Sequence, residues 1–362
     1  MLPVLFVFLL SPGLLLCATA QEPNTDTRAP GGGSRLIVLE KSAARAQLFD
    51  TTTRTLVATV PVGNGPHEVA VAPNGRTAVV SDYGDQRPGS TLTVIDIPNA
   101  RVLATIGLSD AETVDGKVKQ RTFLRPHGLR FLPDGRHVVV TSEMLRRLLV
   151  VDLETQKVVR SLKTAQPTLH MVDLSPDGRT AYGTSIQDGS LGWFAVDGSA
   201  ETASVLPTGD GAEGLAISPR DGSIWVGNRS ANTISVVDAQ KRAVTTTLET
   251  ASFPIRVAFT ADGAHALVSC AEAGCVQVFD AATKTLAHTV DLLADNTELS
   301  PVPIGICVQP DGAFAWIACQ RGEFLAVIDL KTFTVTDRIP GGKGPDGMAF
   351  AQWTAAVPST DK

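Results

Sequence analysis

Three histidines and two carboxylates occupy the same position in a sequence phrase that this chain repeats. Six copies of the phrase are a short apolar run that ends in a Pro-Asp-Gly-like turn, as in RPHGLRFLPDG and VPIGICVQPDG, and the seventh, GPDGMAFA, is truncated. We call the shared position the slot. When the copies are aligned on the turn, the seven slot residues are His67, His127, His170, Glu213, Ile255, Ile304 and Asp346.

Imidazoles together with a carboxylate are a common ligand set for Zn²⁺, Cu²⁺, Fe²⁺ and Mn²⁺. The ionisable slot residues therefore predict a site for a divalent transition metal, if the fold brings them together. A bound ion can acidify a water molecule or polarise a carbonyl group. Glu68, beside His67, and Glu143 are then candidate catalytic carboxylates that move protons. The alternative is that these side chains only hydrate a channel and hydrogen-bond the neighbouring loops.

A second set of polar residues stands next to a slot or near the end of the second apolar run of a unit. These residues suit a ligand with polar or negatively charged groups, because arginine binds carboxylates and phosphates through paired hydrogen bonds. The alternative is ordinary hydrogen bonding between neighbouring units. The ligand-binding candidates are Asp82, Tyr83, Asn228, Arg229, Arg256 and Arg321.

The repeat itself predicts the fold. Each unit contains four apolar runs with period-two alternation, separated by turn residues, which is the signature of β-strands. The slots are 42 to 60 residues apart, and four strands in about 40–45 residues are typical of a β-propeller blade. We therefore predict an all-β, seven-bladed β-propeller with four antiparallel strands per blade.

The two ends of the repeat predict how the ring closes. After Arg35 the sequence has only the second, third and fourth runs of a unit, and after Asp346 it has only a first run. The C-terminal strand is therefore expected to join the N-terminal blade, which removes exposed strand edges. Because the first strand of a blade is innermost, the slot residues should ring one mouth of the central channel. The long connections 83–90, 109–125 and 293–303 lie on the same face, which is predicted to bind the ligand.

Several segments resemble the YVTN β-propeller repeat proteins, the group called YncE-like. They include VIDIPNARVLATI, VVDLETQKVV and WVGNRSANTISVVD, and the resemblance covers roughly residues 35–352. Members and near relatives of this family include lactonase-like enzymes, streptogramin lyases, haem-d1 and multi-copper propellers, and binding proteins. The resemblance implies an exported platform that binds a small-molecule or protein ligand. The alternatives are a metal-dependent lyase or hydrolase that uses the histidine ring, and a haem or copper electron-transfer propeller.

Charge and the N-terminal segment limit partners and location. The formal net charge of −6 disfavours a nucleic-acid partner. Residues 1–20 have the apolar run and Ala-Thr-Ala site of a secretory signal peptide, and residues 21–34 read as a disordered linker. The propeller is expected over 35–352 and a tail over 353–362. Signal cleavage would leave a periplasmic or extracellular monomer without a transmembrane anchor.

Four cysteines remain after the expected cleavage, and an even number in an exported chain favours disulfides. Cys270 and Cys275 flank one tight loop, and Cys307 and Cys319 are expected on paired strands. The spacing leaves all three connectivities open. The sequence has no GxSxG, P-loop or CxxCH motif and no GxGxxG before a helix, so it identifies no nucleophile, nucleotide site or c-type haem attachment.

Overall fold

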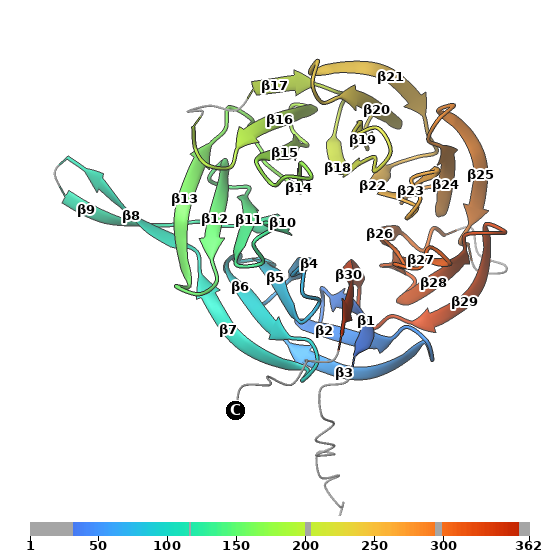
Figure 1. The fold of residues 1–362 in the computed structure, drawn as a ribbon, viewed down its shortest axis with the longest axis horizontal. Helices are drawn as coiled ribbons and strands as arrows, with labels where there is room; N and C mark the ends of the chain where they lie inside the picture. The colour runs from blue at the N-terminus through green and yellow to red at the C-terminus, as the bar shows by residue number, and fades with distance from the viewer. Residues whose placement is uncertain (1–31, 116, 200–203, 294–298, 355–362) are drawn as a thin grey trace, which may run out of the picture.

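The structure confirms the prediction of an all-β, seven-bladed propeller. The computed structural model describes residues 32–115, 117–199, 204–293 and 299–354. Seven four-stranded antiparallel sheets form a closed ring, each with its first strand innermost and its last strand at the rim (Figure 1). The described part of the chain contains no helix, and so no helical membrane span.

Blades are numbered around the ring, and the strands of each are given from the centre to the rim. Blade 1 contains β30 (Pro345–Trp353), β1 (Gly33–Glu40), β2 (Arg45–Asp50) and β3 (Thr55–Pro61). Blade 2 contains β4 (Pro66–Val71), β5 (Thr77–Gly84), β6 (Pro88–Asp96) and β7 (Arg101–Gly107). Blade 3 contains β10 (Pro126–Phe131), β11 (His137–Ser142), β12 (Arg147–Asp152) and β13 (Lys157–Lys163).

The other four blades follow the same order. Blade 4 contains β14 (Val172–Leu174), β15 (Thr180–Ser185), β16 (Ser190–Ala195) and β17 (Ser204–Pro207). Blade 5 contains β18 (Ala212–Ile217), β19 (Ile224–Asn228), β20 (Thr233–Asp238) and β21 (Ala243–Glu249). Blade 6 contains β22 (Pro254–Phe259), β23 (His265–Cys270), β24 (Cys275–Asp280) and β25 (Thr285–Asp291). Blade 7 contains β26 (Pro303–Val308), β27 (Phe314–Cys319), β28 (Phe324–Asp329) and β29 (Thr334–Pro340).

Pairing between β30 and β1 closes the ring, as the ends of the repeat predict. The ladder runs from Glu40 and Pro345 to Gly33 and Trp353. The propeller therefore extends beyond the predicted range of 35–352 at both ends. Gly33 belongs to the sheet rather than to the linker, and Trp353 belongs to the sheet rather than to the tail. Segments 1–31 and 355–362, which include the predicted signal peptide, lie outside the described residues.

One expected loop is a β-hairpin. The connection over 109–125 contains β8 (Ser109–Val114) and β9 (Lys117–Thr122), which pair only with each other. This hairpin projects outward beyond the rim (Figure 1). The prediction of a loop was wrong because the hairpin has no apolar alternation to reveal its strands. Most of its described residues are solvent-exposed.

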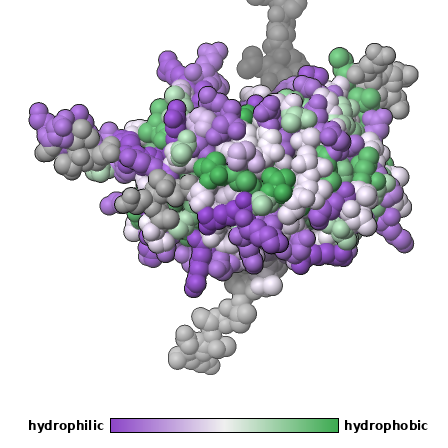
Figure 2. All heavy atoms as spheres, turned by 90° about the horizontal axis from the view of Figure 1, so that it is seen from above, coloured by the Kyte–Doolittle hydropathy of each residue, from purple (hydrophilic) through white to green (hydrophobic). Residues whose placement is uncertain are grey.

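Apolar side chains fill the space between neighbouring blades. Ile37 and Leu48 of blade 1, for example, pack in one buried cluster with Val80 and Ile95 of blade 2. The second and third strands of each blade are consequently covered on both faces. At the edge of the ring, hydrophobic residues occur in small groups among polar ones (Figure 2). The hydrophobic effect therefore holds blade against blade and leaves a largely polar surface.

The disulfide prediction is corrected by the structure. All four described cysteines are free thiols. Cys270 and Cys275 do lie opposite each other on β23 and β24. Cys307 and Cys319 lie on the paired strands β26 and β27, but the register sets Cys307 opposite Trp316 and Cys319 opposite Pro303. Residues at opposite ends of a strand pair cannot be bridged, because a disulfide needs Cα atoms within about 7 Å.

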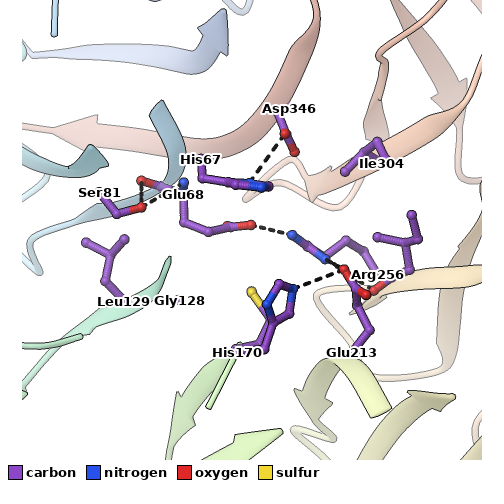
Figure 3. Close-up of polar contacts among 12 residues, drawn as sticks. His67, Glu68, Ser81, Gly128, Leu129, His170, Glu213, Arg256, Ile304 and Asp346 are labelled. Carbon is purple, nitrogen blue, oxygen red and sulfur yellow. Dashed lines mark hydrogen bonds and ion pairs between the residues drawn. The ribbon is translucent and has the colours of Figure 1, made fainter. Parts of the chain in front are cut away.

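A β-bulge marks the slot in six of the seven blades. In each, the innermost strand has one extra residue where it pairs with the second strand, as between Pro66 and Val69. A bulge sets two residues of one strand against one of the next and re-aims their side chains. The slot residue and the residue after it can therefore both face the channel, as His67 and Glu68 do (Figure 3).

Glycines after the slot let neighbouring innermost strands approach closely. A Cβ on Gly347 would come within 2.3 Å of the His67 carbonyl oxygen and 2.9 Å of the Glu68 Cα. Gly128 is similarly pressed against the Met171 Cα of the next blade. These contacts are to backbone, which cannot move aside as a flexible side chain can. The innermost strands can therefore approach this closely only because glycine follows the slot.

We expect Gly347→Ala to destabilise the protein by about 1–3 kcal/mol, because an overpacked contact forces the backbone to shift. The measurement is the free energy of unfolding from a denaturant titration. Gly107→Ala is the matched control, since a Cβ there meets no atom within 4 Å, and it should change the stability by less than about 0.5 kcal/mol. Equal effects of the two substitutions would contradict the close packing of the innermost strands.

Candidate functional site

Five slot side chains from blades 1 to 5 come together at one mouth of the channel, and Figure 3 shows four of them, His67, His170, Glu213 and Asp346. The imidazole of His127 stands between those of His67 and His170, with ring centroids 4.1 Å and 3.7 Å away. Asp346 lies beside His67, and Glu213 lies beside His170. We call these residues the channel-mouth cluster. The cyclic order of the blades thus brings together side chains that are far apart in the sequence.

His127 is the central member of the cluster and has the least satisfied side chain. It is completely buried, and neither ring nitrogen has a hydrogen-bond partner. Burial lowers the pKa of His127 well below its usual value, and the neighbouring His170 lowers it further. The imidazole is therefore neutral and offers a free nitrogen lone pair. Both ring nitrogens are therefore available to a hydrogen-bonding partner or a metal ion.

His170 is held between two carboxylates. Its Nδ1 contacts Glu143, and its Nε2 lies 3.1 Å from Glu213 Oε1. Burial alone would lower the pKa of His170, but Glu213 and Glu143 outweigh it and raise the pKa to about 9. In the absence of a metal ion, His170 is consequently an imidazolium at neutral pH.

Glu213 joins the histidines to two arginines. Arg229 Nη1 lies 2.5 Å from Glu213 Oε2, and Arg256 Nη1 lies 3.4 Å from Glu213 Oε1. Arg256 also binds Glu68, so that blades 5, 6 and 2 are connected across the channel (Figure 3). Burial would raise the pKa of Glu213, but His170 and the arginines hold it well below its usual range. Glu213 is thus a permanent anion.

Lys41 is a cluster contact that the sequence reasoning missed. Its Nζ lies 2.9 Å from His67 Nε2 and 3.3 Å from Asp346 Oδ2. Burial lowers the pKa of His67 to about 3, helped by the Lys41 charge, whereas burial raises the pKa of Asp346. Lys41 follows β1 just as Glu143 follows β11 and Arg229 follows β19. Extending the repeat alignment to the incomplete first unit would have revealed it.

The alternation of side chains along a strand determines which of the predicted ligand-binding residues reach the cluster. Tyr83 donates a hydrogen bond to Glu143 Oε2 at 2.6 Å, and Arg229 pairs with Glu213 as described. The residues one position earlier point elsewhere. Asp82 accepts hydrogen bonds from Thr91 and Thr93, and Asn228 donates to Thr233 and Ser235, in each case within one blade. Successive strand residues face opposite sides, so Asp82 and Asn228 lie apart from the cluster.

Arg321 also lies apart from the cluster. It is exposed on the same face of the ring, in the loop between β27 and β28. Its Nη1 donates a hydrogen bond to the Ser300 carbonyl oxygen at 3.1 Å. Its place in a neighbouring hollow is described below.

Buried hydroxyl groups, also missed by the sequence reasoning, fix the slot backbone. Thr141 Oγ1 donates to the His170 carbonyl oxygen at 2.7 Å, and Ser269 Oγ donates to that of Ile304 at 2.8 Å. Each of these bonds connects one blade to the slot of the next. In the sequence, each of these hydroxyl residues stands one position before the last residue of the second strand, Thr141 before Ser142 and Ser269 before Cys270. These bonds orient the slot side chains before any ligand arrives.

The channel beyond the cluster is apolar. Further along the same innermost strands, a cavity of about 530 Å³ is lined by residues of all seven blades, among them Val69, Phe131 and Phe259. Its charged groups are Arg130 and Asp173, which pair at 3.1 Å. Apolar surroundings strengthen electrostatic interactions within the cluster.

Two members of the cluster and Glu143 have donor atoms close enough together to hold a metal ion. His127, Glu143 and His170 each offer a ligand atom, and these atoms lie within 4.8 Å of one another. The free nitrogens of His127 and an N/N/O donor set suit Zn²⁺ and its transition-metal neighbours. Of the predicted ligands, His67, Glu213 and Asp346 fall outside this group, and Glu143, predicted as catalytic, falls inside it.

These features define a seven-bladed propeller whose ionisable groups converge at one channel mouth. The family model described as "Lactonase, 7-bladed beta-propeller" matches residues 38–310. The chain belongs to this family. The narrower resemblance to YVTN repeats stays a prediction. No curated protein matches the chain.

Solved structures share the fold at low sequence identity. A functionally unknown protein from Desulfotomaculum acetoxidans DSM 771 has a TM-score of 0.68 and 16% identity, covering 88% of this chain and 99% of that one. Dihydro-heme d1 dehydrogenase NirN in complex with DHE has a TM-score of 0.62 and 18% identity, covering 87% of this chain and 74% of that one. Such likeness concerns the fold alone.

The ion pairs of His170 predict a pH-dependent stability. The pKa of His170 is raised from 6.5 to about 9 in the folded state. The resulting stabilisation is fully present below the pKa of the unfolded state and is lost as the pH rises through the pKa of the folded state. Between about pH 6 and about pH 8.5 the metal-free protein should therefore lose about 2 kcal/mol from this residue, at 1.36 kcal/mol per pKa unit.

Denaturant titrations of chelator-treated wild type and His170→Gln at the two pH values measure this loss. The variant cannot become an imidazolium and should show a pH dependence smaller by that amount. Parallel pH dependences in the two proteins would mean that His170 is not charged in the fold.

Proposed function

We propose that this protein is a metal-dependent hydrolase that opens a lactone-type cyclic ester at the channel mouth. The observation that carries the proposal is the buried imidazole of His127, whose two ring nitrogens have no partner, beside Glu143 and His170. Membership of the lactonase propeller family supports the choice of substrate class. Hydrolysis adds one water across the ring ester bond and gives a hydroxycarboxylate and a proton.

His127, Glu143 and His170 would hold the ion. When bound, a divalent metal supplies Lewis-acid polarisation of a carbonyl oxygen and a more acidic water. The surrounding residues keep these ligands in place. Tyr83 donates to Glu143 Oε2, and Glu143 Oε1 contacts His170 Nδ1, so that both carboxylate oxygens are held in place. Partners of this kind orient ligands and tune their basicity.

Glu213 positions His170. Its Oε1 lies 3.1 Å from His170 Nε2, so that a charged carboxylate holds this ring nitrogen. Arg229 and Arg256 keep the carboxylate charged and fixed. Glu68 was predicted as a catalytic carboxylate, but its contact with Arg256 favours a role in bracing Arg256 across the channel.

A non-catalytic binding platform is the second candidate function. Its support is that Glu68, Glu143 and Glu213 each already contact a cationic group. Such a network can simply stabilise a polar channel mouth. The two functions differ in whether metal loading produces turnover. A Soret absorption band in the purified protein would instead favour the haem alternative.

Metal binding can be tested with His127→Gln. We expect chelator-treated wild type to bind one equivalent of Zn²⁺ or Mn²⁺ in isothermal titration, and His127→Gln to bind at least about 100-fold more weakly, since one ligand in three is lost. His137→Gln is the matched control, because His137 contacts Asp134 in a surface turn, and it should bind like wild type. Wild type that binds no equivalent of any divalent transition metal would overturn the metal site.

Turnover is tested by proton release, measured as alkali consumption at constant pH, from a panel of γ- and δ-lactones with metal-loaded wild type. Activity that disappears with chelator and in His127→Gln supports the hydrolase. Stoichiometric metal without activity on any lactone would favour the binding platform.

A further inference from the structure

Two adjoining hollows lie on the cluster face, the first between blades 6 and 7 and the second between blades 7, 1 and 2. The first has a volume of about 460 Å³ and is lined mainly by apolar residues, including Phe253, Ile255, Ala271, Val302 and Ile304. The second is about 710 Å³, is mostly polar and includes Lys41 in its wall. Val302 and Arg321 line both hollows. Each volume lies in the range of small-molecule sites, about 300–1,000 Å³.

The backbone of the apolar hollow places bulky residues in a turn that glycine makes in other blades. The residue two positions before the slot has a left-handed backbone in six blades, and its carbonyl usually accepts a hydrogen bond from the residue after the second strand. In three blades it is glycine, at positions 65, 211 and 344. In blades 6 and 7 it is Phe253 (φ 66°) and Val302 (φ 57°).

Left-handed backbone is unfavourable for residues other than glycine, and most of all for β-branched or bulky ones. Glycine makes the same turn in three blades, so the turn does not explain the choice of Phe253 and Val302. Arg125 occupies the position in blade 3, and Phe253 and Val302 differ from it because their apolar side chains line the hollow. Backbone strain of this kind occurs often at functional sites.

The apolar hollow adjoins the channel-mouth cluster. Arg229 stacks over the Phe253 ring, 5.2 Å from its centroid, and the same guanidinium pairs with Glu213. Ile255 directly precedes Arg256, and Ile304 lies near Arg256 and Asp346 in the close-up (Figure 3). A molecule seated in this hollow would therefore extend towards the ionisable side of the slot ring.

Arg321 gives the hollow a cationic edge. Among the described residues, Arg321 has no carboxylate partner within ion-pair distance, and its recorded contact is the Ser300 carbonyl. The carboxylates near it are engaged elsewhere. Glu323 pairs with Lys343 at 2.8 Å, and Glu272 accepts the Ser252 hydroxyl at 2.7 Å. An arginine without a carboxylate partner is suited to bind an anionic group of a ligand.

We infer that the apolar hollow binds the hydrocarbon body of a small amphipathic carboxylate and that Arg321 binds its carboxylate group. For the proposed hydrolase, on which this substrate assignment rests, the ligand is the product of ring opening. The substrate is then a lactone with an apolar substituent. Binding of the carboxylate does not require the metal ion. The carboxylate site and the proposed hydrolase can therefore be refuted independently.

The test is isothermal titration of chelator-treated protein with octanoate, acetate and 1-octanol. Octanoate should bind at least about tenfold more tightly than acetate, which lacks the hydrocarbon chain, and than 1-octanol, which lacks the charge. Arg321→Gln should remove the advantage of octanoate over 1-octanol. Arg179→Gln, at a side chain that is 87% exposed and outside both hollows, is the control and should bind like wild type.

Val302→Asn tests the apolar wall without unfolding the protein, since asparagine tolerates a left-handed backbone better than valine. We expect octanoate and 1-octanol to bind at least about tenfold more weakly to this variant, with an unchanged or higher thermal midpoint. A purely structural Val302 would instead show altered stability and unaltered binding. Unchanged octanoate affinity in either Val302→Asn or Arg321→Gln overturns the inference.

The result also separates the two proposals. Octanoate binding without any metal binding would leave this site standing and refute the hydrolase. Metal-dependent lactone hydrolysis without octanoate binding would support the hydrolase and refute the carboxylate site.

Discussion

The structure depends on one constraint: seven innermost strands must approach closely enough for a single residue position to become a ring of neighbours. Pairing of β30 with β1 closes that ring, and glycines such as Gly347 allow the strands to touch backbone to backbone. Hydroxyl groups from the second strands, such as Thr141, then bind the slot carbonyls of the next blade. Under this constraint, histidines that are 43 and 60 residues apart in the sequence stack with centroids about 4 Å apart.

Close approach also determines the electrostatics of the cluster. Isolated buried charges are costly, so each ionised group needs a partner. His170 is charged because two carboxylates hold it, and those carboxylates are in turn bound by Tyr83, Arg229 and Arg256. His127 lies inside this network but has none of its hydrogen bonds. His127 is the residue of the cluster in which both ring nitrogens lack a hydrogen-bond partner, and this is the basis of the metal proposal.

The face that carries the cluster is chemically divided. Blades 1 to 5 contribute ionisable slot residues, whereas blades 6 and 7 contribute Ile255 and Ile304. The apolar half continues into a hollow built on strained Phe253 and Val302. A site with polar chemistry on one side and an apolar wall on the other suits a ligand with a reactive polar end and a hydrocarbon body. The lactonase propeller family to which the chain belongs is compatible with such a ligand.

The sequence by itself determined the blade count, the closing strand and the slot, because these follow from periodicity and turn chemistry that are local in the chain. It also identified Glu68, Tyr83, Glu143, Arg229 and Arg256, all of which contact the cluster or its partners. Only the tertiary structure decided which neighbours face the channel, since one bulge or one step along a strand reverses a side chain. For this reason Asp82 and Asn228 lie apart from the cluster, and Cys307 and Cys319 lie at opposite ends of their strands. Partners across the ring, such as Arg256 with Glu68, have no signal in the sequence because ring closure alone brings them together.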